Sequence, residues 1–157
     1  MFSLLSITFA LALSATPALY AQTPASPERQ QAPTQAAQPA PPVLHEYRGV
    51  RLGLTAEQVR GVMGKASRTG EGMDEFKLGD GDLITVYYDA KGAVRTIELY
   101  FTDAARAPAW TEVVGNAEIQ SQPSGSKFAR VVVSDENFWV TMYRSKSGTV
   151  TTITISR

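Results

Sequence analysis

Apolar and polar side chains alternate over several short stretches between residues 74 and 155. A period of two residues is typical of β-strands with one face buried and one face in solvent. The stretches are separated by turns rich in Gly, Asp, Asn and Ser, as expected for antiparallel hairpins. The pattern predicts strands at 74–78, 83–88, 93–101, 128–133, 138–143 and 149–155.

Two short helices are predicted, one before each group of three strands. The first begins after Thr55, whose side chain is expected to form a capping box with Gln58, and it ends at Gly64. The second is expected to start at Pro108 and to end at Gly115. The apolar faces of these helices are Val59, Val62 and Met63 in the first, and Trp110, Val113 and Val114 in the second.

The order helix, strand, strand, strand therefore occurs twice, at 43–103 and at 104–157. A unit of roughly 50 residues without a disulfide or a metal is marginally stable by itself, so we expect the two halves to pack together. The predicted fold class is α+β, with two tandem repeats, each a short helix packed on a small antiparallel three-stranded sheet. The two repeats are expected to form one compact domain over 43–157.

The residues before this domain differ from it in composition. Residues 2–21 carry no charged side chain and end in small residues, which predicts a secretory signal peptide over 1–21. Residues 22–42 are rich in Pro, Ala and Gln and predict a disordered linker. We therefore expect a periplasmic or secreted protein. The alternative is a protein tethered to the inner membrane by an uncleaved N-terminal segment.

Charge and composition exclude several classes of function. Lys plus Arg is 15 and Asp plus Glu is 15, so the formal net charge is zero, which argues against nucleic acid or an anionic membrane as the main partner. The chain has no Cys, which excludes disulfides, thiol nucleophiles, Cys-ligated metals and a lipid anchor on Cys. With one His, a His-rich metal site is excluded as well. These exclusions predict a non-enzymatic protein without a cofactor or a metal.

The segment from Gly53 to Gly64 resembles the opening of the BamE/SmpA-like envelope family, and residues 87–94 resemble that family's aromatic strand and glycine turn. The resemblance covers about 48–101, with Ala66 where the family commonly has Pro. It implies an α+β domain and a role in assembling outer-membrane β-barrels, although the best known members are anchored through an N-terminal Cys that is missing here. A tandem form is also similar to the secreted β-lactamase inhibitor proteins, which bind an enzyme through aromatic-rich sheet faces and loops.

Both relatives bind proteins. The predicted function is accordingly a non-enzymatic protein-binding module of the cell envelope, an adaptor or assembly accessory whose partner is another envelope protein. The alternative is a secreted or periplasmic inhibitor whose partner is a secreted enzyme.

Strand alternation also predicts a binding surface. If Ile84 and Val86 face the helix, Tyr87 and Tyr100 emerge on the opposite face of the sheet, where rigid amphipathic aromatic side chains are typical interface anchors. The alternative is that this face packs on the second repeat. Trp139 and Tyr143 likewise suggest that strand 138–143 is covered on both faces. The candidate partner-binding residues are Tyr87, Tyr100, Thr85, Glu98 and, at the rim, Arg95.

Three other patterns suggest chemistry, and each has a simpler interpretation. Segments 124–127, 134–137 and 146–149 imitate the three boxes of penicillin-recognising enzymes, but they fall on predicted turns. The acidic residues of 71–82 lack the spacing of a calcium loop and predict solvated turns. His45 lies at the linker boundary without a nearby nucleophile, so a catalytic role is not expected.

Overall fold

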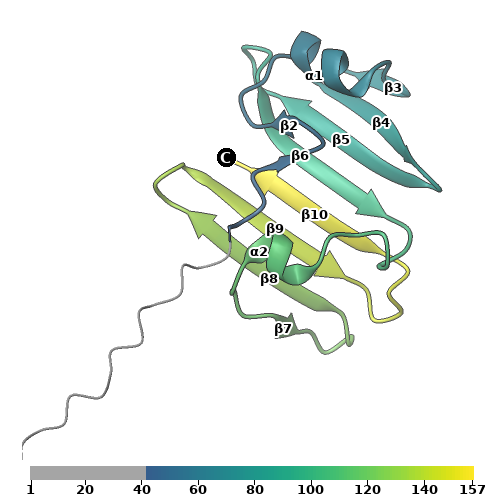
Figure 1. Cartoon of the computed structure of the whole chain (residues 1–157), viewed down its shortest axis with the longest axis vertical. Helices are drawn as coiled ribbons and strands as arrows, with labels where there is room; N and C mark the ends of the chain where they lie inside the picture. The colour runs from purple at the N-terminus through teal and green to yellow at the C-terminus, as the bar shows by residue number, and fades with distance from the viewer. Residues whose placement is uncertain (1–41) are drawn as a thin grey trace, which may run out of the picture. The chain divides into compact units, whose positions relative to one another are not determined.

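The computed structural model describes residues 42–157 (Figure 1). The predicted signal peptide at 1–21 and the predicted linker at 22–42, apart from Pro42, lie outside the described residues. Within the described part, no helix is long and apolar enough to cross a bilayer.

The described residues form two short helices and ten strands. The helices are α1 (Ala56–Met63) and α2 (Trp110–Val114). The strands of the N-terminal half are β1 (Glu46–Tyr47), β2 (Val50–Arg51), β3 (Arg68–Gly70), β4 (Met73–Gly79), β5 (Asp82–Tyr88) and β6 (Val94–Phe101). The strands of the C-terminal half are β7 (Gln120–Ser121), β8 (Lys127–Val133), β9 (Phe138–Arg144) and β10 (Thr151–Ser156).

Strands β3 to β10 form a single antiparallel sheet in the order β3-β4-β5-β6-β10-β9-β8-β7, and β1 and β2 form a separate hairpin. The predicted fold class, two repeats that each hold a separate three-stranded sheet, is therefore wrong. The two halves join edge to edge because β6 pairs with β10, from Phe101 opposite Thr151 to Thr96 opposite Ser156. This pairing satisfies backbone groups that two separate sheets would leave on exposed edges.

One face of the sheet, which we call the inner face, carries the core. Both helices and the β1–β2 hairpin lie on this side (Figure 1). Two apolar rows cross the central strands in exact register: Ile84, Leu99, Ile153 and Met142 form one, and Val86, Ile97, Ile155 and Val140 form the other. All eight side chains are fully buried, so the core is continuous across the junction of the two halves.

The ends of the helices follow local sequence signals. The capping box of α1 is confirmed, because the Gln58 amide donates to Thr55 Oγ1 and the Thr55 amide donates to Gln58 Oε1. Val59 is buried as predicted, but Val62 is 53% exposed. Helix α2 begins two residues after Pro108, where the Ala109 amide donates to the Glu112 carboxylate at 2.7 Å.

An ion pair attaches α1 to the sheet. Arg60 donates to both carboxylate oxygens of Asp74 on β4, from Nε at 2.8 Å and from Nη2 at 3.0 Å. The hydroxyl of Tyr88 on β5 donates to the same carboxylate at 3.0 Å. Asp74 is fully buried, and a buried carboxylate is tolerated only where such donors surround it.

A second ion pair fixes the connection that leaves β6. Asp82 at the start of β5 accepts from Arg106 Nε at 2.7 Å and Nη2 at 3.0 Å, and from the Thr102 amide at 2.8 Å. Asp82 is only 4% exposed. The Arg106 guanidinium, with the Thr102 donors, holds the pKa of Asp82 well below its usual range despite the opposing effect of burial.

We expect this pair to make the protein acid-sensitive. Because the pKa of Asp82 is lower in the folded than in the unfolded protein, its contribution to stability is complete above the unfolded-state pKa of about 3.9 and is lost as the pH falls through the folded-state pKa. Asp82→Asn should lower the free energy of unfolding at neutral pH. Below about pH 4, the free energy of unfolding of this variant should fall less steeply with decreasing pH than that of the unaltered protein. Urea titrations from neutral to acidic pH measure both effects.

The Arg106→Gln variant tests whether the ion pair is the cause. If it is, the variant that carries both Asp82→Asn and Arg106→Gln should lose less stability than the sum of the two single variants, since both changes break the bonds between Asp82 and Arg106. Fully additive losses would mean that Asp82 acts through Thr102 and not through Arg106.

Candidate binding surface

The second face of the sheet, which we call the open face, lies away from both helices and the β1–β2 hairpin (Figure 1). Strand register arranges its side chains in three rows that run across the sheet. The first row is Leu83, Tyr100, Thr152, Tyr143 and Phe128; the second is Glu75, Thr85, Glu98, Thr154, Thr141 and Arg130; the third is Met73, Tyr87, Thr96, Ser156, Trp139 and Val132.

The aromatic side chains of this face come from both halves of the chain. Tyr100 on β6 and Tyr143 on β9 are 37% and 39% exposed, and they flank Thr152 in one row. Two strand spacings separate them, which is roughly 10 Å. In the third row, Trp139 is half-buried, and the guanidinium of Arg130 stacks over its ring at 4.8 Å. A ladder of Thr and Ser hydroxyls on β10 lies between the aromatic groups of the two halves.

The structure brings four of the five predicted binding residues together on the open face. Thr85 pairs with Glu98, and the hydroxyl of Tyr87 donates to Glu98 Oε2 at 3.3 Å. Partial burial, and then the Glu98 charge, raise the pKa of Tyr87 above its usual value, and the neutral hydroxyl is the donor in this bond. Tyr100 lies in the neighbouring row. These positions follow from the alternation of β5 and β6.

Arg95 is the exception. The register shifts at this point, from Tyr87 opposite Thr96 to Tyr88 opposite Val94, and this leaves Arg95 as the extra residue of a bulge. Its side chain is exposed but does not belong to a row of the open face. A bulge is an irregularity in the pairing of two strands, so the sequence of either strand alone does not reveal it.

The second half of the chain does not cover the open face of the first. It continues the sheet beyond β6, so the alternative that Tyr87 and Tyr100 pack on a second repeat is wrong. For the same reason β9 is covered on one side only, with Val140 buried and Tyr143 exposed. Sequence reasoning therefore missed Trp139 and Tyr143 as surface residues, although their alternation was the available signal.

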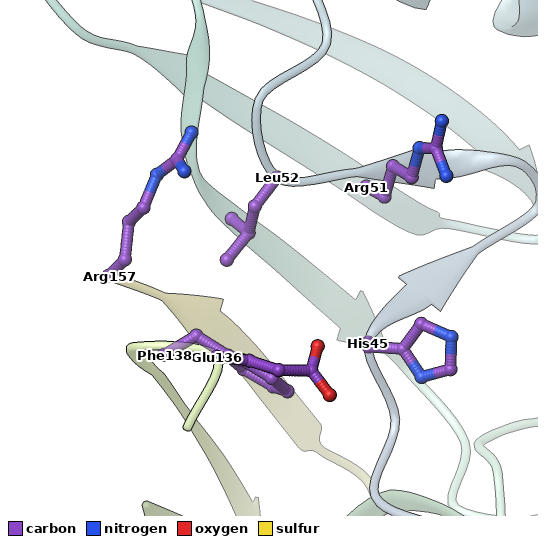
Figure 2. A pocket seen from close by; sticks show the side chains of 6 residues that line it. All are labelled: His45, Arg51, Leu52, Glu136, Phe138 and Arg157. Carbon is purple, nitrogen blue, oxygen red and sulfur yellow. The ribbon is translucent and has the colours of Figure 1, made fainter. Parts of the chain in front are cut away.

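A separate pocket of about 240 Å³ lies between residues 45–52, the β8–β9 turn and the end of β10 (Figure 2). Figure 2 shows the Glu136 carboxylate pointing toward the side of the pocket where His45 lies. His45 Nδ1 is 3.2 Å from the Val43 carbonyl, and the polar side chains that line the pocket are all exposed. The lining residues are His45, Arg51, Leu52, Glu136, Phe138 and Arg157.

The three enzyme-like boxes are not assembled into one site. Segment 124–127 ends at the first residue of β8 and segment 146–149 follows β9, so they lie at the same end of that hairpin. Segment 134–137 is the β8–β9 turn at the opposite end. Strands of this length keep the two ends roughly 20 Å apart. The boxes are therefore ordinary turns.

The prediction that the acidic residues at 71–82 lie in solvated turns is wrong for Asp74 and Asp82, which belong to strands and are buried because each is paired with an arginine. Among residues 42–157 no group of three acidic or histidine side chains is placed to hold a metal ion.

Comparisons with known proteins identify no relative: no family model, no curated protein and no solved structure matches this chain.

Proposed function

We propose that this chain is a non-enzymatic protein-binding module of the cell envelope, an adaptor or assembly accessory that holds another envelope protein on the open face of its sheet. The observation that carries the proposal is the exposure of Tyr100 and Tyr143 on a sheet whose other face already contains the core. Large amphipathic side chains on a rigid sheet lose little conformational entropy on binding, which is why they dominate interfaces.

The second candidate function is inhibition of a secreted or periplasmic enzyme. It is supported by the exposed loop residues 122–125, which lie beside Phe128 and Tyr143 at one end of the open face. A loop next to an aromatic sheet face suits a partner with a cleft, since the loop enters the cleft while the face covers its rim. Under both functions the open face is the contact surface, and the proposals differ in the class of partner.

Site-specific photo-crosslinking tests the proposal. A photo-reactive phenylalanine analogue placed at Tyr87, Tyr100 or Tyr143 should give crosslinks to one and the same partner in cell-envelope extract, because the three positions share one face. The matched control is the analogue at Lys91, which is exposed in the β5–β6 turn. Mass spectrometry of the product separates an envelope component from a soluble hydrolase.

Crosslinks from Lys91 without any from the three tyrosine positions would contradict the proposal, since the loops would then be the contact surface. A hydrolase as the crosslinked partner would favour the inhibitor function.

A further inference from the structure

The outer edge of β8 is open over most of its length. Strand β7 pairs only with the start of β8, where Gln120 is opposite Phe128 and Ser121 is opposite Lys127. Within the part of the chain that the structure describes, no strand pairs with 129–133 on this side. The backbone donors and acceptors of every second residue along this edge therefore face outward, which is the arrangement that accepts a further strand.

This edge lacks the features that usually protect an exposed strand. The sequence from 131 to 133 is Val-Val-Val, and Val132 is 62% exposed. Arg130 is the nearest charge, but its guanidinium lies over Trp139 on the neighbouring strand and not along the edge. A β-branched strand without Pro, bulge or outward charge is a strong pairing surface.

The opposite edge of the same sheet provides an internal comparison. Strand β3 covers only the first part of β4, so the end of β4 is also an edge. There the exposed Lys77 and a register shift between Lys77 and Gly79 interrupt the strand. A charge and a bulge are the usual means of blocking edge pairing. One edge of the sheet is thus protected and the other is open.

We propose that the β8 edge binds a second copy of this chain, in an antiparallel pair centred on Val131. In this pairing Ala129 lies opposite the second copy's Val133, and Arg130 lies opposite the second copy's Val132. No like charges then oppose each other directly, and small or β-branched apolar side chains of the inner face meet across the junction. A two-fold axis perpendicular to the sheet relates the two copies and makes the contact self-complementary.

The pairing joins two sheets into one and puts both open faces on the same side. The chain's own segment 22–42 suits this edge less well, because its six prolines leave no Pro-free run longer than five residues and it contains no β-branched apolar residue to pair with Val131 to Val133. A pair of five-residue strand segments buries less surface than the roughly 1,200 Å² or more of a stable interface. The dimer is therefore weak, and its population depends on concentration.

Sedimentation of the purified protein over a range of concentrations tests the pairing. The average mass should rise with concentration, and Val132→Lys should weaken self-association at least about tenfold by placing a charge on each copy at the junction. Val62→Lys is the matched control, because Val62 is 53% exposed on α1 and the same substitution there should leave self-association unchanged. A monomer at every concentration, or an equal effect of both variants, would overturn the proposal.

Disulfide trapping tests the register. The chain contains no Cys, so a single introduced Cys reports only its own contacts. Val131→Cys lies on the two-fold axis and should form a disulfide-linked dimer under mild oxidation, whereas Val133→Cys, opposite Ala129, should form much less. Equal trapping at both positions would refute the proposed pair. So would a disulfide that Val131→Cys forms in extract with an extended segment of a different protein in preference to a second copy. A monomer that still binds its partner through Tyr100 would leave the proposed function intact.

Discussion

Leu99→Ala is expected to lower the free energy of unfolding by about 3 kcal/mol and to destabilise both halves of the chain equally. Leu99 lies on β6, one of the two strands through which the halves join, and is fully buried between Ile84 and Ile153. Truncating a buried leucine removes apolar contacts and leaves a cavity, which costs about 2–5 kcal/mol. Because the sheet and core continue from β6 into β10, the loss is shared by the whole domain.

The two tryptophans make this prediction easy to measure. Trp110 and Trp139 both belong to the C-terminal half, whereas Leu99 belongs to the N-terminal half. Denaturant unfolding followed by tryptophan fluorescence and by far-ultraviolet circular dichroism should give the same reduced free energy. Val62→Ala, at an exposed position, should change it by no more than about 0.5 kcal/mol. An unchanged fluorescence transition in Leu99→Ala would show that the halves unfold independently.

Replacing both Tyr100 and Tyr143 by alanine is expected to weaken partner binding at least about a hundredfold, because buried aromatic anchors each contribute about 2 kcal/mol or more at interface centres. The two side chains share a row of the open face and are more than one third exposed. Removing them should cost the free protein about 1 kcal/mol or less, since each is partly exposed on the solvent side and has Thr152 as its cross-strand neighbour there. Titration of the crosslinked partner against each variant measures the loss.

Two controls accompany this experiment. The double Phe variant at the same positions keeps the rings and loses only the hydroxyls, so it should bind far better than the double Ala variant. Val62→Ala changes the helical side of the molecule and should bind as the natural protein does. Unaltered binding by the double Ala variant would exclude the open face as the contact surface.

The fold was predictable where a signal lies within a few residues. The Thr55 capping box depends on positions three apart, and the six predicted strands agree with β4, β5, β6, β8, β9 and β10 to within about two residues at each end. The short strands β3 and β7 carried no such signal, since runs of two or three residues show no alternation. Arg60 and Asp74, far apart along the chain, meet only after folding.

Part of the candidate binding surface was likewise predictable from the sequence, and part was not. Alternation along β5 and β6 predicted that Tyr87 and Tyr100 share a face, and they do. It did not show that Trp139 and Tyr143 extend the same surface, because their alternation is equally consistent with a strand covered on both sides. The bulge that separates Arg95 from the others depends on how two strands pair.

The amino-acid sequence by itself determined the capped first helix, the turns, the main strands and the apolar face of each strand. These features depend on backbone preferences and on periods of two or four residues, which a short segment already contains. Only the tertiary structure decided that the two sets of strands form one sheet through β6 and β10, and therefore that one face stays open. Alternation fixes which side of a strand is apolar, but it is the same for a strand at an edge and a strand at the centre. Which strands lie side by side depends on backbone hydrogen bonds between residues far apart in the chain.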